Sequence, residues 1–512
     1  MKKSRFVLLP LALAVHLGVQ AQPVEEIVVL GVRDTSTVRT EDTLVAPPDT
    51  AQLLRQMPGA NINKNGELTG IAQYRGMYGD RVNVSVNGAR ISSSGPNAMD
   101  SPLHYAPVAL LESLTIHRGI TPVSQGQETI GGSVEAVTFA GDFANSSNFT
   151  LNSRLYAGAQ SVNEGAVGSG IFTLANDTHL LRASFMEESA SDSEFAGGSI
   201  RPSAYQRERF DIGYGFHSGA HELRIDFARN NTGDAGTAAL PMDILAVDST
   251  LLNSRYEFQG SDFTFTAELS VNDLDHGMTN YHLRRPPQSP DSNPDPMRFR
   301  QTFATSDSTG FALQLEQYAG NGLWRYGLDG HFAQHDADIF NPNAALFYVG
   351  NFNDAEKQII GIFVERELSI SDNMGLDIGI RYNQVRTDSG TASANLNPMG
   401  MTAGMPFMMN NIARMIAGDF NDQTLARKDN NLDWFARLSM DGSGDLIWYA
   451  GLARKTRSPS YQERYLWMPL ESTGGLADGK TYVGNATLAP EVAHEAELGF
   501  DWNGRDLNLY PR

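Results

Sequence analysis

Cysteine is absent from the 512-residue chain, which excludes disulfides, cysteine zinc sites, iron–sulfur clusters and thiol catalysis together. Basic residues are outnumbered, with 39 Lys and Arg against 59 Asp and Glu, and the resulting net charge of −20 argues against a nucleic-acid-binding protein. Beyond residue 30, no run reaches the ~18 apolar residues that a spanning helix needs. If this chain crosses a membrane, it must therefore do so as a β-barrel.

Enzyme motifs are missing as well. The chain contains no Gly-x-Ser-x-Gly elbow, no His-Glu-x-x-His motif and no P-loop, so no enzyme activity is predicted.

The first 21 residues have the three parts of a secretory signal peptide. Basic residues at positions 2, 3 and 5 precede an apolar stretch over 6–19, and Val19-Gln20-Ala21 is a small-x-small cleavage site. The alternative is an anchoring helix, which Pro10 and His16 disfavour because they interrupt a stretch that is already short. We predict an exported chain that begins near Gln22 after cleavage.

Two regions with different sequence patterns follow the signal peptide. Residues 22–140 alternate short apolar strands with Gly/Asn turns around a helix expected over Thr50 to Gln56, with Asp49 or Thr50 as its cap. Asn87-Gly88 predicts a hairpin. From about residue 148 the chain alternates apolar and polar residues with period 2, and we count roughly 14 such strands up to residue 502. The connections between successive strands alternate between short turns and long polar loops, which is typical of an outer-membrane barrel.

Several short stretches, spread over nearly the whole mature chain, match the motifs of one protein family. The matching stretches are Glu25-Glu26-Ile27-Val28-Val29, Leu53-Leu54-Arg55-Gln56-Met57-Pro58-Gly59, Tyr74-Arg75-Gly76, Val86-Asn87-Gly88-Ala89-Arg90-Ile91, Ile116-His117-Arg118-Gly119, Ile130-Gly131-Gly132-Ser133-Val134, Arg457-Ser458-Pro459 and Asn485-Ala486-Thr487-Leu488-Ala489-Pro490-Glu491. Together they resemble TonB-dependent outer-membrane receptors.

The resemblance implies a transmembrane antiparallel β-barrel with an N-terminal α+β plug domain inside it. It divides the chain into a signal peptide (1–21), an energy-coupling segment (22–35), a plug (36–142) and a barrel (143–512). The family barrel has 22 strands, so we expect a chain that is incomplete at its C-terminus. The implied setting is a monomer in outer-membrane lipid. Glu26, Ile27, Val28 and Val29 would contact a TonB-type transducer of the inner membrane, by adding a strand to the partner's sheet edge.

Two further stretches resemble the copper-receptor branch of the family. In that branch a cysteine and a methionine four residues apart hold copper in the plug; Met99 falls on the methionine, whereas Gly95 stands at the cysteine position. His276-Gly277-Met278 resembles the His-x-Met element of its barrel, and residues i and i+2 of a strand share one face. The implied ligands are Met99, His276 and Met278, with copper as the substrate and no prosthetic group.

The long connection over 387–430 holds six of the chain's 17 methionines within 17 residues. They are Met399, Met401, Met405, Met408, Met409 and Met415. One interpretation is a metal-capture loop of thioethers, and the other is a patch packed on the barrel rim, because Met fills irregular gaps. The glycines and asparagines around them favour a loop over a packed helix, with at most a short helix at Asn411 to Ile416.

The remaining histidines and the receptor's substrate leave alternatives open. His104 either assists Met99 or makes a plug hydrogen bond, and we expect His331 and His335 to share no common face. Arg75 is expected to pair with a barrel carboxylate. The predicted function is copper import; the alternatives are transport of an iron or other metal chelate, and a non-transporting or truncated barrel.

Overall fold

The computed structural model describes residues 35–40, 46–397, 399–442, 446–470, 480–503 and 508–509. The predicted signal peptide and the predicted transducer-contacting residues at 26–29 lie outside these ranges. None of the helices within them is long and apolar enough to cross a membrane.

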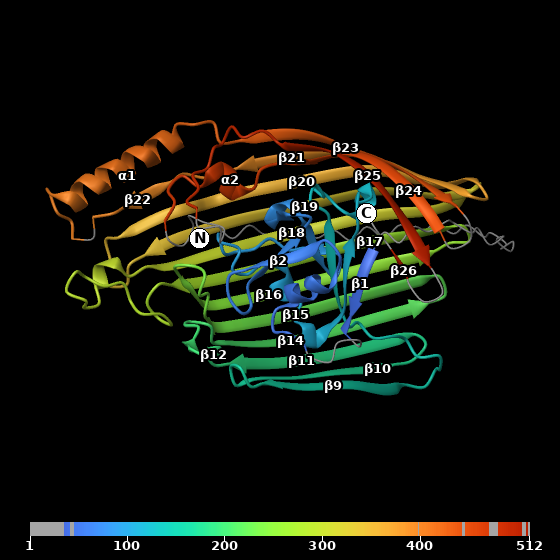
Figure 1. Ribbon diagram of the computed structural model, residues 1–512, viewed down its shortest axis with the longest axis horizontal. Coiled ribbons are helices and arrows are strands. Elements are labelled where there is room, and N and C mark those ends of the chain that lie inside the picture. The colour runs from blue at the N-terminus through green and yellow to red at the C-terminus, as the bar shows by residue number, and fades with distance from the viewer. Residues whose placement is uncertain are drawn as a thin grey trace.

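The N-terminal part forms two small sheets that lie against the inner face of a much larger sheet (Figure 1). One has five strands in the order β1-β7-β8-β5-β6, and the other has the order β2-β3-β4. Its elements are β1 (Thr35–Arg39), η2 (Thr50–Gln56), β2 (Ala60–Lys64), β3 (Gly70–Tyr74), β4 (Met77–Tyr78), η3 (Gly79–Arg81), β5 (Asn83–Val86), β6 (Ala89–Arg90), η4 (Pro102–Tyr105), η5 (Val108–Leu110), β7 (Leu111–His117), η6 (Val123–Gln125) and β8 (Ser133–Thr138).

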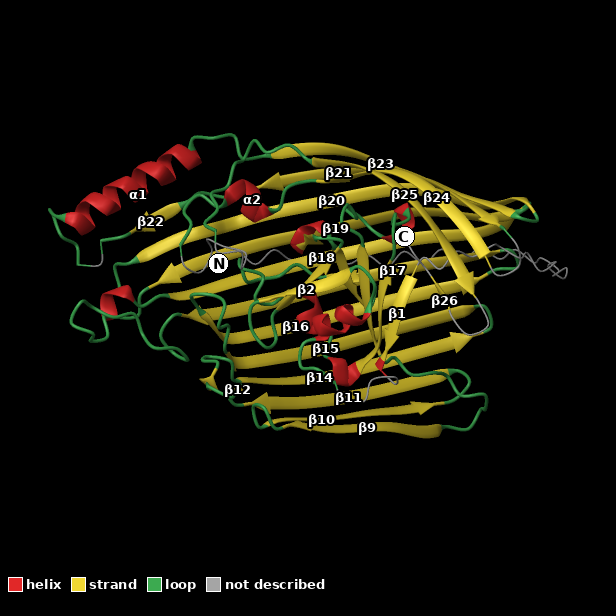
Figure 2. Cartoon of the chain, in the orientation of Figure 1, coloured by secondary structure: helices red, strands yellow, loops and turns green. Residues whose placement is uncertain are grey.

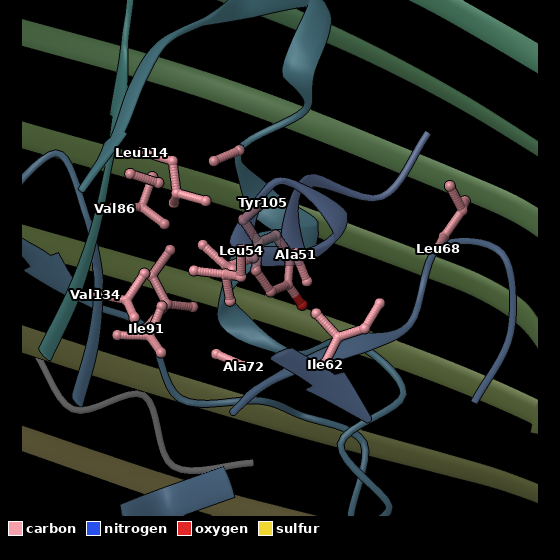
Figure 3. Close-up of a cluster of buried hydrophobic side chains, with 14 of the residues drawn as sticks. Ala51, Leu54, Ile62, Leu68, Ala72, Val86, Ile91, Tyr105, Leu114 and Val134 are labelled. Atoms are coloured by element: carbon pink, nitrogen blue, oxygen red, sulfur yellow. The ribbon is translucent and has the colours of Figure 1, made fainter. Parts of the chain in front are cut away.

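The structure contains the helix, the helix cap and the hairpin that the plug sequence predicted. The expected helix spans Thr50–Gln56, although it is a 3-10 helix, and the Asp49 side chain caps it by accepting from the amide of Ala51 at 3.0 Å. The Asn87-Gly88 hairpin joins β5 to β6 with both residues at positive φ, as a type I′ turn requires. Around η2, apolar side chains from both sheets pack into one buried cluster (Figure 3).

Asp49 gives the plug a pH dependence. Burial raises the pKa of this carboxyl from 3.8 to about 6. Between these values the folded plug keeps a proton that the unfolded chain releases, so stability falls as the pH rises through this window. We expect amide exchange in η2 to show progressively weaker protection between pH 4 and 6 relative to Asp49→Asn measured at the same pH. If the difference in exchange protection between the unaltered chain and Asp49→Asn stayed constant from pH 4 to pH 6, the raised pKa of Asp49 would be contradicted.

The larger sheet confirms the predicted count of about 14 long strands. All neighbouring long strands are antiparallel and follow chain order from β9 to β25, apart from short β12, β13 and β22 in the connections. They are β9 (Thr150–Gln160), β10 (Gly165–Ala175), β11 (His179–Ala190), β14 (Tyr205–Ser218), β15 (His221–Ala235), β16 (Asp243–Gln259), β17 (Phe263–Thr279), β18 (Gln301–Ala319), β19 (Gly322–Phe340), β20 (Tyr348–Ser371), β21 (Met374–Asp388), β23 (Arg427–Asp441), β24 (Leu446–Arg457) and β25 (Glu491–Asn503).

The alternating pattern of these strands places apolar side chains outside and polar side chains inside. On β21, Ile378, Ile380 and Tyr382 are exposed, whereas Arg381 and Asn383 between them are buried against the plug side. This is the reverse of a soluble sandwich and is the arrangement of a barrel that faces lipid.

The two ends of the sheet differ in their connections (Figure 2). Tight turns close the end that we call the turn end, for example between β14 and β15 and between β18 and β19. The other end, the loop end, carries long connections and most of the small elements outside the plug. These are β12 (Glu194–Phe195), β13 (Gly198–Ser199), η7 (Pro296–Arg298), β22 (Ser393–Asn395), α1 (Met405–Asn421) and α2 (Tyr461–Tyr465), whereas β26 (Asn508–Leu509) follows β25.

Helix α1 corrects the expectation of a loop at 387–430. Seventeen residues are helical, and the helix buries Ala413, Ala417 and Phe420. Gly404 at the N-cap and Pro406 in the first turn, which suggested a loop, both precede a regular helix. The six methionines are 43–68% exposed, so they do not pack on the barrel rim.

Candidate functional site

The loop between β6 and η4, residues 91–101, is built around one buried carboxylate. Asp100 accepts hydrogen bonds from the hydroxyl of Ser93, from the amide and hydroxyl of Ser94, from the amide of Gly95 and from the hydroxyl of Tyr105. Although burial alone would raise its pKa, the attraction of His276 and these hydrogen bonds hold it well below the usual range. Asp100 is therefore an ionised acceptor, and it fixes the shape of this plug loop.

His276 of β17 meets this carboxylate from the barrel side. Its Nδ1 lies 3.1 Å from Oδ1 of Asp100, and both side chains are fully buried. Because an ionised carboxylate only accepts, Nδ1 must carry a proton, so the nitrogen that can offer a lone pair to a metal ion is Nε2. Nε2 is buried and has no hydrogen-bond partner within the described part of the chain. A carboxylate on one imidazole nitrogen and a free second nitrogen is the usual arrangement of a metal-binding histidine.

Two buried methionines lie next to this contact in the chain. Met99 adjoins Asp100 in the plug loop, Met278 follows His276 by two residues, and both belong to one buried cluster. The relative exposures of Met99, His276 and Met278 are 0%, 1% and 0%. Met99 and Met278 thus share a buried cluster that plug and barrel residues form together, and His276 contacts the plug through Asp100.

Met242, just before β16, is a further sulfur that the sequence did not single out. It is fully buried in the same cluster, and its sulfur lies 4.0 Å from Oγ1 of Thr302, which is the cross-strand partner of Met278. Neither Met242 nor Asp100 stands in a motif: 176 residues separate Asp100 from His276, so only the fold reveals their contact.

Gly95 has no room for the cysteine of the copper branch. A β-carbon built on it would lie 2.7 Å from Nδ1 of His276 and 2.7 Å from Oδ1 of Asp100. Glycine at this position is what lets the plug loop and the barrel histidine approach each other so closely. A thiol here would displace the hydrogen bond that orients His276.

Two other residues singled out in the sequence, His104 and Arg75, have structural roles. Nδ1 of His104 donates to the carbonyl of Leu68, and its Nε2 is hydrogen-bonded to the hydroxyl of Thr232; burial lowers its pKa to about 3. The hydrogen-bond interpretation of His104 is therefore confirmed. Arg75 lies 3.7 Å from the barrel carboxylate Glu497, as expected.

His331 and His335 contradict the expectation that they share no face. Both lie within β19, where positions four apart point the same way, and both are buried on the inner side. The expectation assumed a mixture of strand and loop here, whereas β19 runs unbroken through both positions.

A second plug–barrel contact is ionic. Glu128 of the plug lies 2.8 Å from Lys357 of β20 and 3.0 Å from Arg90 of β6, and it accepts the amide of Ser458 at 2.9 Å. Burial alone would raise the pKa of Glu128, but Lys357 and then Arg90 lower it to about 2. This buried cluster fixes the plug to the barrel wall.

A plug seated in a strand-rich sheet, with buried ionic and imidazole contacts between the two, defines the class of plugged outer-membrane receptors. The family models agree: residues 33–133 match the TonB-dependent receptor plug domain, and residues 189–510 match the TonB-dependent receptor-like β-barrel. The chain belongs to the TonB-dependent receptor family.

Solved structures of several such proteins resemble this fold. The copper transporter OprC has a TM-score of 0.74 at 21% identity, covering 92% of this chain and 70% of the other. The Serratia marcescens hemophore receptor HasR, in complex with its hemophore HasA and heme, has a TM-score of 0.67 at 18% identity, covering 93% and 70%. The ferric enterobactin receptor PfeA has a TM-score of 0.63 at 14% identity, covering 93% and 71%. At these identities the likeness shows the shared fold.

Proposed function

We propose that this receptor binds copper and imports it through the outer membrane with energy from a TonB-type partner. The observation that carries the proposal is the His276 imidazole, whose Nδ1 is held by Asp100 and whose buried Nε2 has no partner. Met99, Met278 and Met242 supply buried thioethers in the same cluster. Sulfur and imidazole together suit copper and suit hard cations poorly. The likeness in fold to a copper transporter agrees with this substrate.

The methionines of α1 extend the proposal to the cell surface. Met405, Met408 and Met409 stand at positions i, i+3 and i+4 of the helix and are exposed, and Met399 and Met401 precede them. An exposed group of single thioethers binds Cu(I) weakly and reversibly. Such a face would gather copper at the loop end without competing with the buried site.

The test is the copper content of the purified receptor after loading with Cu(I) and washing. About one copper per chain should remain in the unaltered protein, because a buried imidazole with thioethers retains a soft ion. Met99→Ala should lose it, whereas Met440→Ala, which removes an exposed methionine of β23, should not. If the unaltered receptor retains no copper, the substrate is a metal chelate instead.

A further inference from the structure

Two cavities meet at His331 on the inner face of the sheet: an upper one along β19 and β20, and a lower one, nearer the turn end, along β15 to β20. The upper one, of about 140 Å³, borders Gly95 and is lined by His331, His335 and Tyr461. The lower one, of about 520 Å³, reaches the turn end at Arg224 near the start of β15. Because Gly95 also lies against His276, the upper cavity adjoins the proposed copper site.

His335 has a free nitrogen in the upper cavity. The side chain is 4% exposed, its Nδ1 has no hydrogen-bond partner, and its ring stacks on Tyr461 with 4.0 Å between centroids. Buried polar atoms are nearly always paired, so an unpaired one in a cavity indicates a ligand or water position. Ser306, opposite His335 on β18, likewise has a buried hydroxyl with no partner.

The strand register orders the three imidazoles from the loop end to the turn end. His276 pairs with Ala304, and Ala304 pairs with Ala337, so His276 is level with position 337 of β19. His335 lies two positions below this level and His331 six positions below it. At ~3.3 Å per residue, His331 is about 20 Å nearer the turn end than His276 along the strand.

His331 lies at the partition between the two cavities. Among the residues that the structure describes, Asn83, Arg90 and His331 line both cavities, and the hydroxyl of Ser92 is 3.0 Å from Nε2 of His331. Asn83, Arg90 and Ser92 belong to the plug, whereas His331 belongs to the barrel. A plug displacement that separated Ser92 from His331 would free this imidazole nitrogen and open the partition between the two cavities.

We propose that His335 and His331 are successive single-imidazole stations for copper on its way from His276 to the periplasmic side. This inference rests on the proposed copper function. Because Gly95 has no side chain, the upper cavity stays open beside the copper-binding site. His335 receives the ion in this cavity. His331 takes it over when the plug moves. Single imidazoles hold the ion weakly enough for it to leave, which passage along a multi-site path requires.

The test compares copper binding with copper uptake in His335→Phe, which keeps an aromatic ring for the stacking on Tyr461. The purified variant should retain copper like the unaltered receptor, because His276 is untouched. Uptake of copper ions by energised cells should fall several-fold. Ala333→Leu is the second variant: it narrows the upper cavity between the two histidines without removing an imidazole, and it should also lower uptake. His221→Phe, at an exposed site at the turn end, is the control and should change neither.

The outcomes separate this route from the proposed function. If both lumen variants retain copper and import it at the unaltered rate, the route is wrong and the binding site stands. If the unaltered receptor retains no copper, the proposed function itself fails. Copper loss in His335→Phe alone would make His335 a ligand of the first site and would overturn its role as a separate station.

Discussion

His276→Ala is expected to lower the affinity for Cu(I) by more than about 100-fold. Removing an outer partner of a metal ligand costs about 10–100-fold in affinity, and removing the ligand itself costs more. The effect follows from the proposed ligand role of His276, whose buried Nε2 has no hydrogen-bond partner among the described residues. Titration of the purified receptor against a competing Cu(I) chelator measures the affinity. His221→Ala is the matched control, because His221 is exposed at the turn end.

Asp100→Asn, in the same titration, distinguishes a metal-binding histidine from a merely packed one. The amide removes the charge that fixes the proton on Nδ1 of His276, and we expect a loss of about 10–100-fold. A purely structural role would change the melting temperature and leave the affinity of the folded protein unchanged. An unaltered affinity in both His276→Ala and Asp100→Asn would remove this site from copper binding.

Local sequence signals predicted the parts of the fold that depend on neighbouring residues. The cap at Asp49, the turn at Asn87-Gly88 and the alternation around Arg381 each need only a few adjacent residues. The same reasoning missed helix α1, because the glycines and asparagines around the methionines favoured a loop. Met405, Met408, Met409 and Ile412 follow helical spacing, and all four are exposed.

The candidate site was predictable only where a family motif carries it. Met99, His276 and Met278 follow from the resemblance, but Asp100, Met242 and the cavity beside Gly95 depend on contacts between the plug and β17. His331 and His335 were within reach of the sequence, since a four-residue spacing in a strand defines a common face. What the sequence analysis did not recognise is that one strand, β19, continues through both histidines to Phe340.

Glu128→Ala should destabilise the seating of the plug by about 3–5 kcal/mol, the cost of removing one partner from a buried ion pair. Lys357 and Arg90 would both remain near the vacated position, and the amide of Ser458 would lose its acceptor. Urea-induced opening of the plug, followed by amide exchange in β5 and β8, measures the loss. Lys64→Ala breaks a half-exposed pair with Glu67 in the same domain and should cost about 0–1 kcal/mol.

The pH dependence of the stability lost in Glu128→Ala tests whether that loss is electrostatic. The pKa of Glu128 is lowered from 4.5 to about 2 in the folded protein, so its ionised form stabilises the plug above pH 4.5. As the pH falls toward 2, the carboxyl takes up a proton and this stabilisation is lost. The unaltered chain and Glu128→Ala should therefore converge in plug stability at acid pH. A difference that stays constant from pH 7 to pH 2 would show that Glu128 acts by packing alone, and that the ion pairs with Lys357 and Arg90 do not hold the plug.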